Sequence, residues 1–226
     1  LKFNDNVKFC IIDISLIEFQ SNIKKIKKII LNNFNIKFII VDQKPFKLKI
    51  KYIHYYYFAP IIPKNYINDN SSFGFDNFLL QKKEIKKNKS DNINILIGKT
   101  NFLNKIITDT FNDYQSNKKI IIWGQKSLSP RINSNKYKNI SELISENFFI
   151  VKFGQTVYEL LYLGKYQCVL NYGLSDIDKN ICDYLSRNNL IKFLYPDRLD
   201  EYFLNYKEEY LIFIKSRKQI LSNYKT

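Results

Sequence analysis

The sequence predicts an α/β protein with two open parallel sheets, one in each half of the chain. Short apolar segments with the length of buried strands recur along the sequence. Most are followed by segments whose apolar residues repeat every three or four positions, as in helices, and this alternation is typical of parallel sheets. A stretch without periodicity, rich in lysine, asparagine and serine, separates two such series. We therefore expect two domains, residues 1–88 and 89–226.

The first series predicts a βαβ unit followed by a third strand. A strand over residues 8–14 precedes a helix for which Ser21 suits the N-cap. A second strand over residues 36–41 completes the unit, whose crossover should be right-handed. The third strand covers residues 51–58, and residues 64–92 show no clear period. The first half is therefore expected to hold three parallel strands.

Two of these strands close in an acidic residue, Asp13 and Asp42. At the carboxyl end of a parallel strand, a carboxylate can point into the cleft expected between the two domains or cap the following turn. Both interpretations stay open at this stage.

The second series predicts five strands that alternate with helices. The strands are expected over residues 94–97, 119–123, 148–152, 167–171 and 190–194. The helices are expected over residues 102–111, 140–145, 154–163 and 177–186, with further helical stretches to the end. Gly164 suits the left-handed position just after a helix. In such sheets ligands bind at the carboxyl ends of the strands, against helix N-termini.

The charge balance allows two interpretations. Lys+Arg 36 against Asp+Glu 21 gives a net charge of +15, which suits a nucleic-acid or anionic-membrane partner. However, lysine, asparagine, isoleucine, tyrosine and phenylalanine dominate everywhere, as in chains coded by AT-rich DNA, and we favour this composition bias. We expect no nucleic-acid partner. The lysine runs at residues 24–28 and 82–87 are interpreted as solvated faces, with peripheral docking on an anionic membrane as the alternative.

Several other classes are excluded by composition. The three cysteines are odd in number and far apart, which speaks against a disulfide framework or a zinc cluster and favours a reducing, cytoplasmic compartment. A single histidine, His54, supports neither a histidine-based metal site nor a Ser-His-Asp triad. No apolar run reaches the roughly 18–20 residues of a membrane span. Because methionine is absent even at position 1, we expect a segment of a longer protein.

The first candidate site follows the strand over residues 94–97. Gly98, Lys99, Thr100 and Asn101 form a turn in which the glycine lets a ligand approach the backbone, and the next helix offers free N–H groups to a phosphate. The spacing of a P-loop is absent. An ordinary turn between a strand and a helix is the alternative.

The second candidate site follows the strand over residues 148–152. Gly154, Gln155 and Thr156 can present backbone amides to a diphosphate, and Glu159 can accept hydrogen bonds from ribose hydroxyls. The spacing of Thr156 and Glu159 also has the form of a capping box, a purely structural alternative.

Residues 139–185 resemble the C-terminal half of GT-B-fold nucleotide-sugar enzymes. The most similar families are the UDP-sugar hydrolase of pseudaminic acid synthesis, its spore-coat-polysaccharide relatives and the family-28 glycosyltransferases of peptidoglycan synthesis. Five residues match their G-G-S-T-x-x-E and L-G-x-P motifs: Gly154, Thr156, Glu159, Leu163 and Gly164. The turn at residues 98–101 is similar to their I-L-I-x-x-G-G-S-D loop, and the strands ending in V-D and I-D resemble the end of their N-terminal domain.

The sequence departs from these families at four positions. Where the families have a glycine, a serine and a proline, this sequence has Lys99, Gln155 and Tyr166, respectively. Asp178 falls where the families have a glutamine near the nucleotide, and its extra carboxylate would repel a diphosphate. The families' glycine-rich loop with its histidine would lie before residue 1, so the catalytic residues of this chain stay unknown.

The resemblance implies a GT-B-like fold of two Rossmann-like halves with a truncated N-terminal half. It further implies a UDP-sugar-binding enzyme, a hydrolase or glycosyltransferase of surface-polysaccharide or nonulosonic acid biosynthesis, without cofactor or metal. The expected substrate-binding residues are Gly98, Lys99, Thr100, Asn101, Gly154, Gln155, Thr156, Glu159 and Asp178. The alternatives are a basic nucleic-acid-binding protein and a non-catalytic relative with the same fold. The oligomeric state is left open.

Overall fold

The computed structural model of the protein has two compact units, residues 1–79 and 80–226. The structure describes residues 6–14, 16–46, 50–74, 92–98, 100–113, 119–124, 126–129, 132–136, 143 and 145–223. The predicted boundary between residues 88 and 89 lies within residues 75–91, which are outside the described part. That boundary therefore stays a prediction, and each unit is described by itself.

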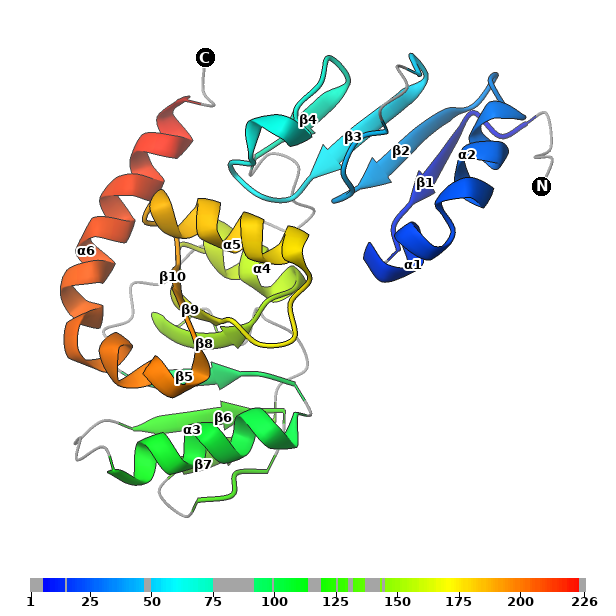
Figure 1. Ribbon diagram of the computed structural model, residues 1–226. Coiled ribbons are helices and arrows are strands. Elements are labelled where there is room, and N and C mark those ends of the chain that lie inside the picture. Colours follow the sequence, from blue (N-terminus) through cyan, green and yellow to red (C-terminus); the bar gives the residue numbers. More distant parts are fainter. Residues whose placement is uncertain are drawn as a thin grey trace. The chain divides into compact units, whose positions relative to one another are not determined.

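The first unit contains a four-stranded parallel sheet with strand order β1-β2-β3-β4 (Figure 1). The strands are β1 (Phe9–Ile12), β2 (Lys37–Val41), β3 (Ile53–Tyr57) and β4 (Ser71–Phe73). The helices are α1 (Leu16–Ser21), α2 (Ile23–Leu31) and the short 3₁₀ helix η1 (Lys64–Tyr66). The three predicted strands are present. The fourth, β4, was not predicted, because a Ser-Ser-Phe segment carries no apolar alternation and is held by its pairing with β3.

The prediction that Ser21 is an N-cap is wrong. Ser21 is the last residue of α1, and its hydroxyl donates a hydrogen bond to the carbonyl of Glu18 at 3.0 Å. The N-cap of α2 is Asn22, whose side chain makes no capping hydrogen bond. Ser21 therefore belongs to helix α1, which was not predicted, and does not precede the predicted helix as a cap.

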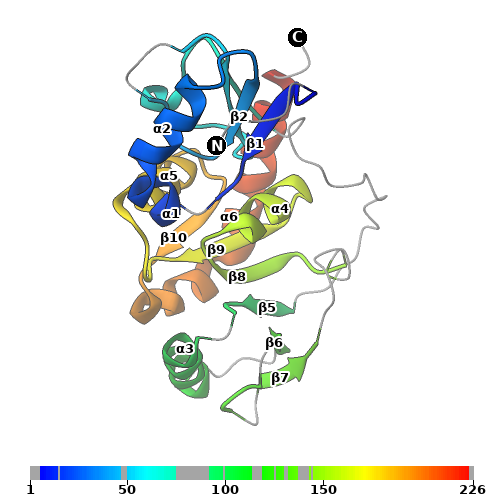
Figure 2. The same cartoon turned by 90° about the vertical axis from the view of Figure 1, so that its right-hand side faces the viewer.

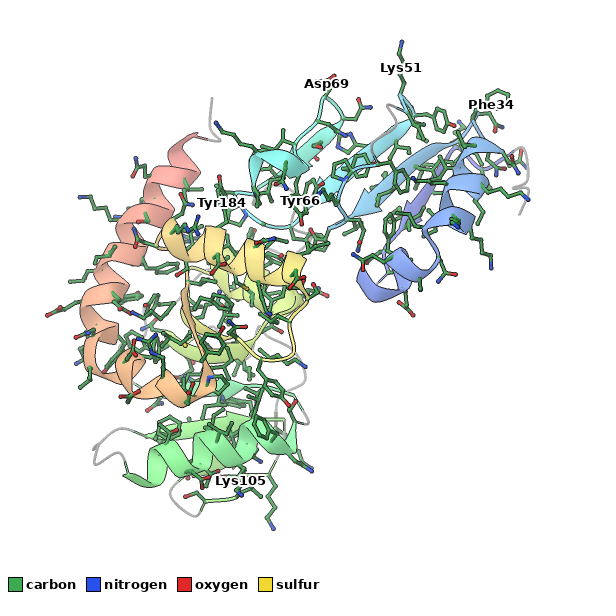
Figure 3. The ribbon with its side chains drawn as sticks, viewed as in Figure 1. Phe34, Lys51, Tyr66, Asp69, Lys105 and Tyr184 are labelled. Atoms are coloured by element: carbon green, nitrogen blue, oxygen red, sulfur yellow. The ribbon has the colours of Figure 1, made fainter. Side chains whose placement is uncertain are left out.

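The helices of this unit pack on one face of its sheet. Phe46 stacks on Phe19 of α1, meets Tyr55 of β3 edge to face, and lies under the ammonium of Lys27 of α2. The opposite face of the edge strand β1 carries Phe9, which is 61% exposed. Figure 3 shows Phe34, also exposed, on the segment between α2 and β2.

The second unit contains a six-stranded parallel sheet with strand order β10-β9-β8-β5-β6-β7 (Figures 1 and 2). The strands are β5 (Ile93–Leu96), β6 (Ile120–Trp123), β7 (Ile132–Asn135), β8 (Phe148–Lys152), β9 (Tyr166–Leu170) and β10 (Lys192–Leu194). The helices are α3 (Asn101–Asp113), α4 (Gln155–Tyr162), α5 (Asp176–Arg187), the short 3₁₀ helix η4 (Pro196–Arg198) and α6 (Leu199–Asn223). Numbered from β5, this order is the 3-2-1-4-5-6 order of doubly wound sheets, which reverses direction between β5 and β8.

All five strands predicted for this unit are present. The sixth, β7, was not predicted, because Ile-Asn-Ser-Asn has a single apolar residue and lies at the edge of the sheet with three exposed side chains. The helix expected over residues 140–145 falls mostly on residues outside the described part.

Helices cover both faces of the second sheet. The side chain of Gln167 on β9 donates to the carbonyl of Val157 in α4 at 2.8 Å. Its neighbour Tyr166 points to the other face, where its hydroxyl donates to Glu209 of α6 and its ring stacks on Tyr202. Because adjacent strand residues alternate between faces, α4 and α6 lie on opposite sides of the sheet.

The C-terminal end of α4 confirms the prediction for Gly164. This residue has φ +71°, and the N–H of Lys165 bonds back to the carbonyl of Leu160 at 2.8 Å, as in a Schellman motif. Arg217 of α6 donates to the carbonyls of Leu161 and Tyr162 at 2.9 and 2.7 Å. The guanidinium thus binds the carbonyl of Tyr162 at the helix end, shares the carbonyl of Leu161 with the N–H of Gly164, and joins α6 to α4.

Candidate functional site

The two predicted loops lie side by side where the strand order of the second sheet reverses. Strands β5 and β8 are paired in parallel, with Leu96 opposite Val151. Each is followed within two residues by a glycine of the predicted site, Gly98 after β5 and Gly154 after β8. In doubly wound sheets this reversal is the place where ligands bind, because the loops on its two sides diverge.

The backbone at both glycines leaves room for a ligand. Gly98 has φ +64°, and Gly154 has φ +158° with ψ −167°, conformations that L side chains rarely adopt. A Cβ atom added at either residue would meet no atom within 4 Å. The positions therefore require glycine for the backbone conformation, and a ligand can approach the main chain there.

The N-terminus of α4 has no side-chain cap. Its N-cap is Gly154, and the first turn contains no acidic residue. The carbonyl of Gly154 accepts from the N–H of Val157 at 3.0 Å, which leaves the amides of Gln155 and Thr156 at the open start of the helix. These are the amides that the sequence assigned to a diphosphate.

The capping-box alternative for Thr156 and Glu159 is wrong. Because the helix begins at Gln155, Thr156 lies inside its first turn and cannot serve as the N-cap. Glu159 instead accepts a hydrogen bond from the side chain of Gln155, one turn earlier, at 3.2 Å. The carboxylate is half-buried, and burial raises its pKa, while the bond from Gln155 acts in the opposite direction.

A capping box does exist at the start of α5. The N–H of Asp178 donates to the hydroxyl oxygen of Ser175 at 3.2 Å, and the N–H of Ser175 donates to the Asp178 carboxylate at 3.3 Å. Asp176 adds a second carboxylate to this turn. The helix thus satisfies its own N-terminus, and its charges disfavour an anion there. The predicted contact of Asp178 with a nucleotide stays a prediction, and the proposal below places the diphosphate at α4 and not at this turn.

The turn before α3 is closed by its own backbone. The N–H of Thr100 donates to the carbonyl of Gly98 at 3.0 Å, and its hydroxyl donates to the carbonyl of Ile97 at 3.2 Å. Asn101 is the exposed first residue of the helix. Lys99 lies outside the described residues.

A third loop, after β9, belongs to the same edge and was missed. Gly173 has φ +64° and open space where a side chain would be. Just before it, Tyr172 stacks on Phe102 of α3. Gly173 closely follows a predicted strand, as the glycines of the other two loops do, and this spacing could have identified the loop. It was missed because the loop matches no motif of the resembled families.

The described residues gather no group of three or more His, Cys, Asp or Glu side chains able to hold a metal ion. The cysteines Cys10, Cys168 and Cys182 are free, and burial raises the pKa of each thiol. His54, on the first sheet, contacts the hydroxyl of Ser72 at 2.9 Å. Across the described part of the chain, no helix is both long and apolar enough to cross a membrane.

The two parallel sheets define a mixed α/β protein with a Rossmann-like, GT-B-like fold. The glycosyltransferase SnogD from Streptomyces nogalater has a similar structure, with a TM-score of 0.54 and 12% sequence identity. The match covers 77% of this chain and 53% of that chain, so the protein spans about half the length of SnogD. No family model and no curated protein sequence matches. At this identity the likeness confirms the predicted fold class, and the activity belongs to the proposal below.

Proposed function

We propose that the protein binds a UDP-linked sugar at the N-terminus of α4. The diphosphate would accept hydrogen bonds from the backbone around Gly154, Gln155 and Thr156, and the ribose would donate to Glu159. The observation that carries the proposal is the uncapped start of α4, next to the reversal of strand order and open above its glycine. The turn at Gly98 would contact the same ligand from the neighbouring strand.

Electrostatics at this edge of the sheet support an anionic ligand at α4. The free N–H groups of a helix N-terminus carry partial positive charge. Lys152, the last residue of β8, adds a partly exposed ammonium two positions before Gly154. The start of α5 offers the opposite environment, since Asp176 and Asp178 occupy it. We therefore expect an anion to prefer the start of α4 over the start of α5.

We propose the further chemistry on the resemblance to the GT-B enzymes. The protein would act on the bond between sugar and diphosphate, as a hydrolase or glycosyltransferase of surface-polysaccharide or nonulosonic acid biosynthesis. Amides fixed at the helix start would stabilise charge on the departing diphosphate. The glycosyltransferase fold of SnogD supports this class at the level of the fold. A relative that binds the nucleotide without catalysis is the second candidate.

The test compares UDP binding and thermal stability in wild type and Glu159→Gln. Glutamine can keep a hydrogen bond with Gln155, and Glu159 caps no backbone group, so the melting temperature should change little. Loss of the charged acceptor should weaken UDP binding roughly ten- to a hundredfold. Calorimetry measures the affinity.

The matched control is Asp183→Asn, which removes an exposed carboxylate from α5 and should leave both quantities unchanged. The proposal is wrong if wild type does not bind UDP at millimolar concentration. It is also wrong if Glu159→Gln melts earlier but binds UDP normally. A titration with duplex DNA at about 150 mM salt decides the nucleic-acid alternative, for which tight and steeply salt-dependent binding is expected.

A further inference from the structure

Two aromatic side chains stack across the carboxyl edge of the second sheet. Phe102 is the second residue of α3, which follows β5, and Tyr172 lies in the loop that follows β9. Their ring centroids are 5.1 Å apart and their planes differ by 20°. The contact joins two loops that are far apart in the sequence.

The stack lies at the same edge of the sheet as the proposed diphosphate site. In the sheet, β8 lies between β5 and β9. Two strand spacings, about 10 Å, separate β5 from β9, and the stack links the segments that follow these two strands. The loop after β8 contains Gly154 and leads into α4. The aromatic pair and the uncapped helix start therefore follow neighbouring strands at one edge of the sheet.

The pair leaves an aromatic surface open. Although it is stacked, Phe102 remains 54% exposed, whereas aromatic side chains usually bury most of their area. The glycines of the three surrounding loops, Gly98, Gly154 and Gly173, have no atom within 4 Å of a built Cβ. The space beside the backbone of these three glycines is therefore open.

We propose that Phe102 and Tyr172 form the subsite for the sugar ring of the bound nucleotide sugar. One end of the diphosphate carries the ribose, which the proposed function assigns to Glu159, and the other end carries the sugar. The C–H face of a pyranose would pack on the open aromatic surface, and its hydroxyls would point to solvent or to the Tyr172 hydroxyl. This inference rests on the proposed function, because the helix start of α4 fixes the diphosphate.

The experiment measures the affinities of UDP, UDP-glucose and UDP-N-acetylglucosamine by calorimetry in wild type, Phe102→Leu and Tyr172→Leu. Both substitutions should weaken the binding of at least one UDP-sugar about three- to tenfold and leave UDP within twofold. Tyr172→Phe keeps the stack and is the matched control: it should weaken UDP-sugar binding less than Tyr172→Leu does and leave UDP within twofold. Melting curves of each variant check that the unit stays folded.

A second measurement uses the wild type alone and does not depend on the variants. Saturation of the protein's aromatic protons by NMR should transfer to the pyranose protons of the bound UDP-sugar more strongly than to its ribose protons. Transfer mainly to the uracil, or equal weakening of UDP and UDP-sugar, would assign the stack to the base and overturn the inference. Unchanged UDP-sugar affinities in both leucine variants would also overturn it while leaving the proposed function in place. If the wild type binds no UDP, both the proposed function and the inference about the sugar ring are wrong.

Discussion

Asp42 occupies an unusual backbone conformation at the end of β2. Its φ of +49° lies in the left-handed region that few residues other than glycine adopt. Its carboxylate accepts a hydrogen bond from the N–H of Phe58 at 3.0 Å, so it ties down the turn after β3. Burial is the main cause that raises its pKa to about 7; the bond from Phe58 opposes this and the charge of Asp13 adds to it.

This carboxyl makes the stability of the first unit depend on pH. The folded state holds the proton more tightly than the unfolded chain, so the stabilisation is complete at low pH and is lost as the pH rises through about 7. This rise in the pKa of Asp42 corresponds to a change of at most about 4 kcal/mol in the free energy of unfolding. We expect wild type to be less stable at pH 8 than at pH 5 in urea denaturation.

Asp42→Asn should remove most of this pH dependence, because asparagine tolerates the left-handed conformation and does not ionise. The control is Asp69→Asn, an exposed aspartate of the same unit (Figure 3), which should keep the wild-type dependence. An equal fall in stability between pH 5 and pH 8 for wild type and Asp42→Asn would refute the assignment.

Single residues show what local sequence can and cannot predict. Gly164 was predicted as a helix terminator, because its role follows from its own backbone freedom and a leucine-rich helix before it. The role of Thr156 and Glu159 was not decided by their spacing. A T-x-x-E sequence can form a capping box at a helix start or lie within the helix. Here the helix begins at Gln155, so Thr156 and Glu159 lie within it.

At the scale of elements, α6 owes its position to contacts that its sequence alone does not reveal. The helix was predicted only as helical stretches near the C-terminus. Its aromatic residues meet strand residues of the sheet: Tyr206 lies edge to face on Phe148 with centroids 4.6 Å apart, and Phe213 packs on Tyr166. These partners are distant in the chain, so local periodicity could not identify them.

The contact of Arg217 with the end of α4 predicts a large effect of a conservative substitution. Arg217→Lys keeps the charge but cannot reproduce the two bonds from Nε and Nη2 to the carbonyls of Leu161 and Tyr162. We expect a loss of about 2–3 kcal/mol in the free energy of unfolding. Lys218→Ala, one residue along on the exposed side of α6, should change it by less than about 0.5 kcal/mol. Chemical denaturation measures both, and equal effects would contradict the assigned role.

The edge strands β4 and β7 mark the limit of pattern-based prediction of elements. Both are short and carry polar residues where a buried strand would carry apolar ones. Central strands such as β8 and β9 are buried on both faces and mostly apolar, so their sequences are recognisable without tertiary information.

At the scale of the whole molecule, the sequence predicted the alternation of strands and helices but not the strand order. The strand order depends on which side of the preceding strand each new strand is added to, and no local sequence pattern specifies that side. The reversal between β5 and β8 is what brings the loops at Gly98 and Gly154 together. The family motifs had placed both segments in one site, and the sheet provides the physical reason for their proximity.

In the proposed site, a nucleotide diphosphate binds the start of α4 and avoids the start of α5. The most direct test is a titration of the isotope-labelled full chain with UDP, followed by amide ¹H–¹⁵N spectra. We predict concentration-dependent shifts at the amides of Gly154, Gln155 and Thr156, and much smaller ones at Asp176 and Asp178, whose turn is closed by its own capping box. Shifts centred on α5, or no shifts at millimolar UDP, would show that the proposed site at α4 is wrong.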